Sequence, residues 1–180
     1  MTDSVQTAIT FKDYFPLIGV VLGGVLAVSG GYFSNHILER NRRKSESKNL
    51  AFAFKGELKA LSAIANKRGY VKHISNMIKR MQDNGKPLFV LINVRREYFN
   101  VYKSNVNNIG MLPAPLPELI ARYYIQANSI LEDLESYRDG SWASAGVDDL
   151  IASKTELVEL MEDTFSLGDS IAEKIDEIYS

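Results

Sequence analysis

The first long feature of the hydrophobic pattern is a stretch without formal charge near the N-terminus. Between Tyr14 and Asn35 the only ionisable side chains are the Tyr14 and Tyr32 phenols. As a helix, residues 15–33 would be about 28 Å long, which matches a hydrocarbon layer of about 30 Å. We therefore predict a transmembrane helix over residues 14–35, with aromatic side chains at both of its ends.

Two other interpretations of this stretch stay open. One is a helix buried inside a globular domain. The other is a cleaved signal peptide, because Ala27-Val28-Ser29 resembles a small-x-small cleavage site. Against cleavage, the residues that follow the stretch are densely basic, and translocated segments tend to avoid such charge.

Small residues recur at every fourth position within the predicted span. This spacing places them on one face of a helix, where a second helix can approach closely. Glycine is also common in membrane helices without such a role. We expect this packing face to join the anchor to another copy of the chain or to another membrane protein; it consists of Gly19, Gly23, Ala27 and Gly31.

Behind the span, apolar residues recur at helical spacing over residues 34–81, so we predict a helix that can break near Gly69. Asp-Asn-Gly at 83–85 predicts a turn. Periodicity does not decide whether residues 87–93 are extended or helical. A further helix from Val94 is expected to stop at Gly110 in the C′ position.

The last third of the chain predicts two helices joined by a loop. Pro117 suits the first turn of one helix, which ends before Gly140. The other begins at Asp148 or Asp149 and carries apolar residues at heptad spacing. The predicted fold class is all-α, with one N-terminal transmembrane helix followed by an antiparallel, coiled-coil-like helical bundle.

Charge is strongly segregated along the chain, although the net charge is only −1. Residues 36–127 hold 17 basic and 6 acidic residues, whereas residues 128–180 hold 3 basic and 14 acidic ones. We expect the two parts to pack against each other. The predicted organisation is an extracytoplasmic N-terminus (1–13), the span (14–35) and a helical cytosolic domain (36–180).

A group of basic residues directly follows the span and sets its orientation. An excess of Lys and Arg marks the cytoplasmic side, so the N-terminus is expected outside and the domain inside. Such charges also attract anionic lipid headgroups. The predicted headgroup and topology residues are Arg40, Arg42, Arg43, Lys44 and Lys48.

The sequence gives little support for catalysis. It has no cysteine, and its two histidines, His36 and His73, do not form a metal-binding spacing. Phosphate-binding and serine-hydrolase motifs are absent. We interpret the acidic residues of the C-terminal part as a solvated face. We expect no cofactor, no metal and no small-molecule substrate, and we do not expect nucleic-acid binding.

One short pattern gives a resemblance. It reads Tyr102-x-x-Asn105-x-x-x-Ile109-Gly110-x-Leu112-Pro113 and is followed by Arg122-Tyr123-Tyr124. With the anchor and the basic helix, it resembles small single-pass bacterial or phage-encoded inner-membrane proteins that have a helical cytosolic domain and no assigned activity. The resemblance implies bacterial or phage origin and inner-membrane placement, and it does not point to an activity. We interpret Asn105 as a helix-end hydrogen bonder and Tyr124 as a core aromatic residue.

These observations favour a membrane-tethered, non-enzymatic interaction or scaffold protein that self-associates through its anchor. An alternative is a membrane-acting effector, such as a phage-exclusion or defence component, whose spans assemble and disturb the bilayer. Against it, Ser29 is the only polar residue within the span that could face a lumen. An enzyme with an unrecognised site is the third hypothesis.

Overall fold

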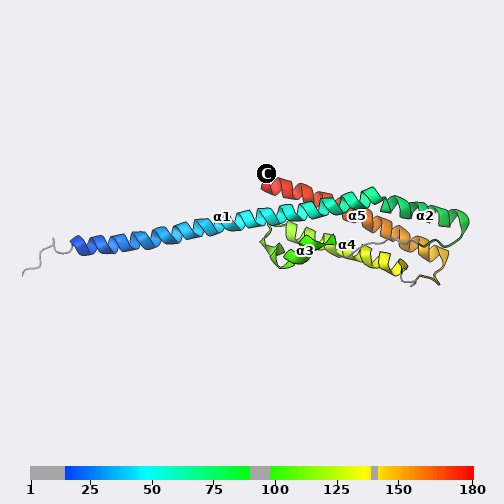
Figure 1. Ribbon diagram of the computed structural model, residues 1–180, viewed down its shortest axis with the longest axis horizontal. Helices are drawn as coiled ribbons and strands as arrows, with labels where there is room; N and C mark the ends of the chain where they lie inside the picture. Colours follow the sequence, from blue (N-terminus) through cyan, green and yellow to red (C-terminus); the bar gives the residue numbers. More distant parts are fainter. Residues whose placement is uncertain (1–14, 90–97, 139–141) are drawn as a thin grey trace, which may run out of the picture. The chain divides into compact units, whose positions relative to one another are not determined.

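The computed structural model describes the backbone of residues 15–89, 98–138 and 142–180, and the side chains of residues 36–89, 98–137 and 142–180. Every regular element in these ranges is a helix (Figure 1). The all-α prediction is confirmed. The chain divides into two units, residues 1–45 and 46–180, and we describe each by itself.

Helix α1 (Phe15–Arg68) begins in the first unit and ends in the second. The side chains of the predicted span, 14–35, lie outside the described ones, and its packing face of Gly19, Gly23, Ala27 and Gly31 lies there too. Among the residues whose side chains are described, no helix is long and apolar enough to cross a membrane. The transmembrane helix therefore gains no support here and stays a prediction.

Two glycines set the ends of helix α2 (Tyr70–Asn84). Gly69, between α1 and α2, has φ of 62° and ψ of 36°, and Gly85 has φ of 62° and ψ of 22°. Residues with a Cβ rarely adopt this left-handed conformation, so glycine is suited to both positions. The Gly85 N–H also donates to the Met81 carbonyl at 2.9 Å. The predicted break near Gly69 and the predicted turn at 83–85 are both confirmed.

The segment around the predicted stop at Gly110 differs from the prediction. Helix α3 (Asn100–Asn105) is short and continues into the 3₁₀ helix η3 (Val106–Met111), which contains Gly110. Gly110 is not among the glycines with positive φ, so it is not a left-handed C′ residue. Asn105 explains the change: its φ of −127° interrupts the α-helix. Of the apolar run at 87–93, residues 87–89 carry no regular structure and the rest lies outside the described residues.

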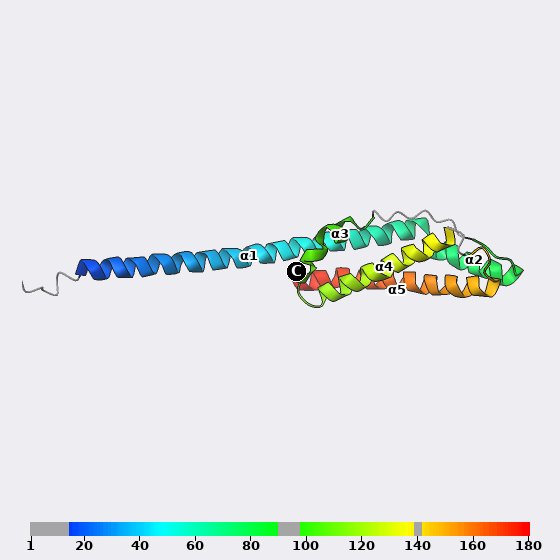
Figure 2. The same cartoon turned by 90° about the horizontal axis from the view of Figure 1, so that it is seen from below.

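Helices α4 (Leu116–Arg138) and α5 (Val147–Tyr179) run antiparallel and side by side (Figure 2). Pro117 lies in the first turn of α4, as predicted. Helix α5 begins one residue before the predicted start, after Gly146. Asp148 and Asp149 lie in its first turn, where negative charge interacts favourably with the helix dipole.

The core of the second unit consists of two clusters of buried side chains, and both clusters share α4 and α5. In one, Phe54 and Leu58 of α1 pack with residues such as Ile120 of α4. In the other, Ile74 and Met81 of α2 belong to the same cluster as α4 and α5 residues. The break at Gly69 therefore separates two helices that cover different parts of the α4–α5 pair. The predicted heptad seam of α5 is buried at Leu157, Met161, Thr164, Gly168, Ile171 and Ile175.

Candidate functional site

Four of the five predicted headgroup residues lie in the first unit, and all of them are exposed on α1: Arg40, Arg42, Arg43 and Lys44. Glu39 pairs with two of them. Arg43 Nε donates to Glu39 Oε1 at 2.9 Å, and Arg42 Nη2 lies 3.3 Å from Glu39 Oε2. The Arg43 hydrogen bond is the main cause that lowers the pKa of Glu39, so this carboxylate is an anion at neutral pH. The local positive charge is therefore smaller than the count of basic residues indicates.

Lys48, the fifth predicted headgroup residue, lies in the second unit and has a different environment. Its Nζ donates to the Tyr179 carbonyl at 2.9 Å and lies 5.8 Å from the centroid of the Phe52 ring. The neighbouring Ser47 is buried, and its Oγ donates to the Met111 carbonyl at 3.0 Å. Lys48 thus contacts the end of α5, a role that differs from the predicted one at the lipid headgroups and does not test it.

Glu57 of α1 organises the start of α3. Its carboxylate accepts hydrogen bonds from the Val101 N–H at 2.7 Å and the Tyr102 N–H at 3.2 Å, and the Tyr124 hydroxyl donates to it. The two N–H groups belong to the first turn of α3, where backbone donors lack helical partners. Glu57 therefore joins α1, α3 and α4 through one carboxylate.

Tyr124 and Asn105 have the structural roles that the sequence analysis predicted. Tyr124 is fully buried, and its ring stacks on Tyr102 with centroids 4.0 Å apart. Burial is the first cause that raises its pKa, and the hydrogen bond to Glu57 is the second. The Asn105 Nδ2 donates to the Val101 carbonyl at 2.9 Å, one turn earlier in the chain. Both interpretations are confirmed.

Lys154 of α5 is a buried base that the sequence analysis missed. Its side chain is 0% exposed, and its Nζ has no hydrogen-bond partner among the described residues. The Nζ lies 3.6 Å from the centroid of the Tyr137 ring. Burial lowers the pKa of Lys154 from 10.5 to about 8. The sequence does contain an indication that Lys154 is buried. Lys154 lies four residues after Leu150 and three before Leu157, which is the spacing of the buried residues on α5.

Trp142 lies beside the same tyrosine. Its ring centroid is 5.5 Å from that of Tyr137, and its Nε1 donates to Ser136 Oγ at 3.1 Å. Trp142 is therefore a packing residue at the connection between α4 and α5. The Tyr137 hydroxyl is also paired, because it lies 2.6 Å from Ser153 Oγ.

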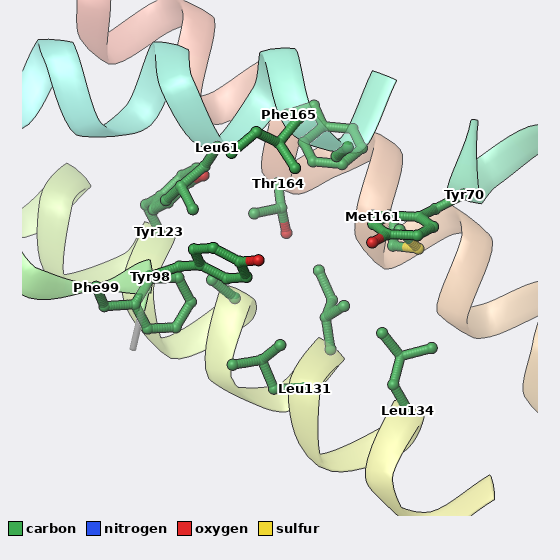
Figure 3. A pocket seen from close by; sticks show the side chains of 14 residues that line it. Leu61, Tyr70, Tyr98, Phe99, Tyr123, Leu131, Leu134, Met161, Thr164 and Phe165 are labelled. Carbon is green, nitrogen blue, oxygen red and sulfur yellow. The ribbon is translucent and has the colours of Figure 1, made fainter. Parts of the chain in front are cut away.

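A second feature that the sequence analysis missed is a cavity of about 90 Å³ within the second unit. Its wall comes from the end of α1, the start of α2, residues 98–99, α4 and α5 (Figure 3). Leu61, Phe99, Leu131, Met161 and Phe165 make it largely apolar. Its few polar groups are the hydroxyls of Tyr70, Tyr98, Tyr123 and Thr164.

In the part of the chain that the structure describes, no three or more His, Asp or Glu residues lie close enough together to hold a metal ion. Comparison with known proteins adds no family: no family model, no curated protein and no solved structure matches this chain.

Proposed function

We propose that this chain is a membrane-tethered, non-enzymatic interaction or scaffold protein that self-associates through its anchor. The observation that carries the proposal is the exposed basic segment of α1, residues 40–44, which begins five residues after the end of the uncharged stretch 14–35. The proposed location is the bacterial inner membrane, with the N-terminus outside and residues 36–180 in the cytoplasm.

The basic segment would lie at the height of the lipid headgroups. Each Lys or Arg there can gain about 1 kcal/mol from an anionic surface. Arg40 and Lys44 are the strongest candidates for binding headgroups, because Glu39 forms ion pairs with Arg42 and Arg43 and partly neutralises them. Lys48 is expected to contribute less, since its ammonium donates to the Tyr179 carbonyl.

Self-association is tested by changing the proposed packing face. Gly23→Ile places a branched side chain where a second backbone would approach, so we expect the dimer signal in a membrane association assay to fall at least tenfold. Val25→Leu is the matched control, because Val25 lies on the opposite side of an ideal helix. An equal signal for Gly23→Ile and Val25→Leu would show that the small residues do not form the interface.

Orientation is tested by labelling single cysteines, because the natural chain contains none. In intact spheroplasts a membrane-impermeant maleimide is expected to label Ser4→Cys and to spare Gln82→Cys on the exposed surface of α2. Gln82→Cys should become reactive after permeabilisation. Labelling of Gln82→Cys in intact spheroplasts would place the domain outside and contradict the proposal.

A further inference from the structure

The cavity of the second unit combines an apolar interior with hydroxyl groups. Figure 3 shows the Tyr98 and Thr164 hydroxyls turned toward the space between the helices, while Leu134 and Met161 close its other side. The Thr164 hydroxyl donates to the Leu160 carbonyl at 2.6 Å. With water-sized groups of about 30 Å³ each, the cavity has room for about three methylene groups.

Arg68 is not itself part of the lining, but its guanidinium contacts a residue that is. Arg68, the last residue of α1, donates from Nη1 to the Tyr70 hydroxyl at 2.6 Å. Both Tyr70 and Tyr98 line the cavity. The hydrogen bond with Tyr70 is the main cause that raises the pKa of the guanidinium, and the Tyr98 hydroxyl adds to it. Arg68 thus remains a cation next to two cavity residues.

The guanidinium has capacity to bind an anion as well. It carries five N–H donors in a planar fork that matches a carboxylate. Arg68 is exposed, so a carboxylate can reach it from solvent. The break at Gly69 directly follows Arg68 and places Tyr70 at the start of a separate helix.

We propose that this cavity binds a short-chain fatty acid, with its alkyl chain among Leu61, Leu131 and Met161 and its carboxylate on Arg68. The apolar lining of the cavity buries the alkyl chain, and the positive charge of the guanidinium attracts the carboxylate. The partly open cavity allows a chain somewhat longer than three methylene groups to extend toward the mouth. The site is independent of the proposed membrane tether.

The test uses the full chain in lipid nanodiscs with ¹³C-labelled methionine methyl groups, and hexanoate as the probe. Met161 lines the cavity, whereas Met111 is exposed elsewhere. We expect hexanoate to shift the Met161 methyl signal in a saturable manner at millimolar concentrations or below, and to leave Met111 unchanged. No saturable shift at Met161, or equal shifts at both methyl groups, would overturn the proposal.

The carboxylate contact is tested with Arg68→Gln, and Lys67→Gln is the control with the same loss of charge at the adjacent exposed position. Arg68→Gln is expected to weaken hexanoate binding at least tenfold and to leave hexanol binding unchanged. Lys67→Gln should affect neither. Equal losses for hexanoate and hexanol, or an effect of Lys67→Gln as large as that of Arg68→Gln, would exclude Arg68 as the anion partner.

The cavity itself is tested with Ala127→Leu, which adds volume to its lining. We expect binding of both hexanoate and hexanol to be lost while unfolding stays cooperative. If Ala127→Leu unfolds the chain, Leu131→Phe gives the same test from the next turn of α4. Retained hexanoate binding in a folded variant would place the ligand elsewhere and overturn the proposal.

Discussion

Replacing Lys154 with methionine should stabilise the protein at neutral pH. The Lys154 side chain is 0% exposed and its Nζ has no hydrogen-bond partner within the described ranges. A fall of its pKa from 10.5 to about 8 corresponds to about 3 kcal/mol of destabilisation when the amine is charged. The Tyr137 ring, 3.6 Å from Nζ, favours the cation and offsets part of this. We therefore expect Lys154→Met to raise the free energy of unfolding by about 1–3 kcal/mol near pH 7.

The same substitution should change how stability depends on pH. Between pH 8 and 10.5 the unfolded chain binds the Lys154 proton and the folded chain does not, so stability rises with pH in this window. The penalty is complete below about pH 8. Tyr137, whose pKa is raised by burial, opposes this rise only where tyrosines begin to ionise. Lys154→Met removes the rise, so the difference between the two proteins should shrink from about pH 8 upward.

Urea unfolding in nonionic detergent measures this difference, with the single tryptophan as the probe. Trp142 packs on Tyr137 and therefore reports on the surroundings of Lys154. Lys154→Arg is the matched control, because arginine keeps its charge throughout the accessible pH range and should be less stable than the natural protein. The account would be refuted if Lys154→Met were less stable than the natural protein near pH 7. It would also be refuted if the stability difference between the two did not shrink as the pH rises.

Two further predictions follow from other contacts. Tyr124→Phe removes the hydroxyl that donates to Glu57 and should lower the free energy of unfolding by about 1.5–3 kcal/mol in the same urea titration. Gly56→Ala should raise it by about 0.5–1 kcal/mol, because a Cβ there meets nothing within 4 Å in the interior of a helix. Gly168→Ala should lack this gain and be about 1–3 kcal/mol less stable than Gly56→Ala, since its Cβ would lie 2.9 Å from the buried Tyr123 ring. Equal stabilities of the two alanine variants would contradict the close packing at Gly168.

Helical periodicity predicted most of the fold, because the positions of the helices depend on local features of the sequence. On α5, apolar residues that alternate between spacings of three and four are buried, as the heptad pattern requires. Gly69 and Gly85 occupy two positions where the backbone is left-handed. Gly110 shows where such signals fail. Its sequence context suits a helix stop, but the interruption at Asn105 had already turned the chain into a 3₁₀ helix.

The candidate sites depend on contacts that local patterns do not contain. Lys154 fits the seam spacing, yet a charged residue at such a position is normally interpreted as exposed. The cavity needs α1, α2, α4 and α5 together, so no single segment predicts it. Lys48 donates to the Tyr179 carbonyl, which lies 131 residues further along the chain, so no local pattern predicts this contact.

Alkaline carbonate extraction of membranes from cells that express the full chain tests the membrane tether most directly. If residues 14–35 form an uncleaved transmembrane helix, the chain stays in the membrane pellet at its full mass. Replacement of Leu22 and Val25 with arginine should release it, because each charge at the centre of a span costs about 2.5–3.5 kcal/mol on insertion scales. Recovery of the natural chain in the supernatant, or at a mass reduced by the N-terminal segment, would contradict the account.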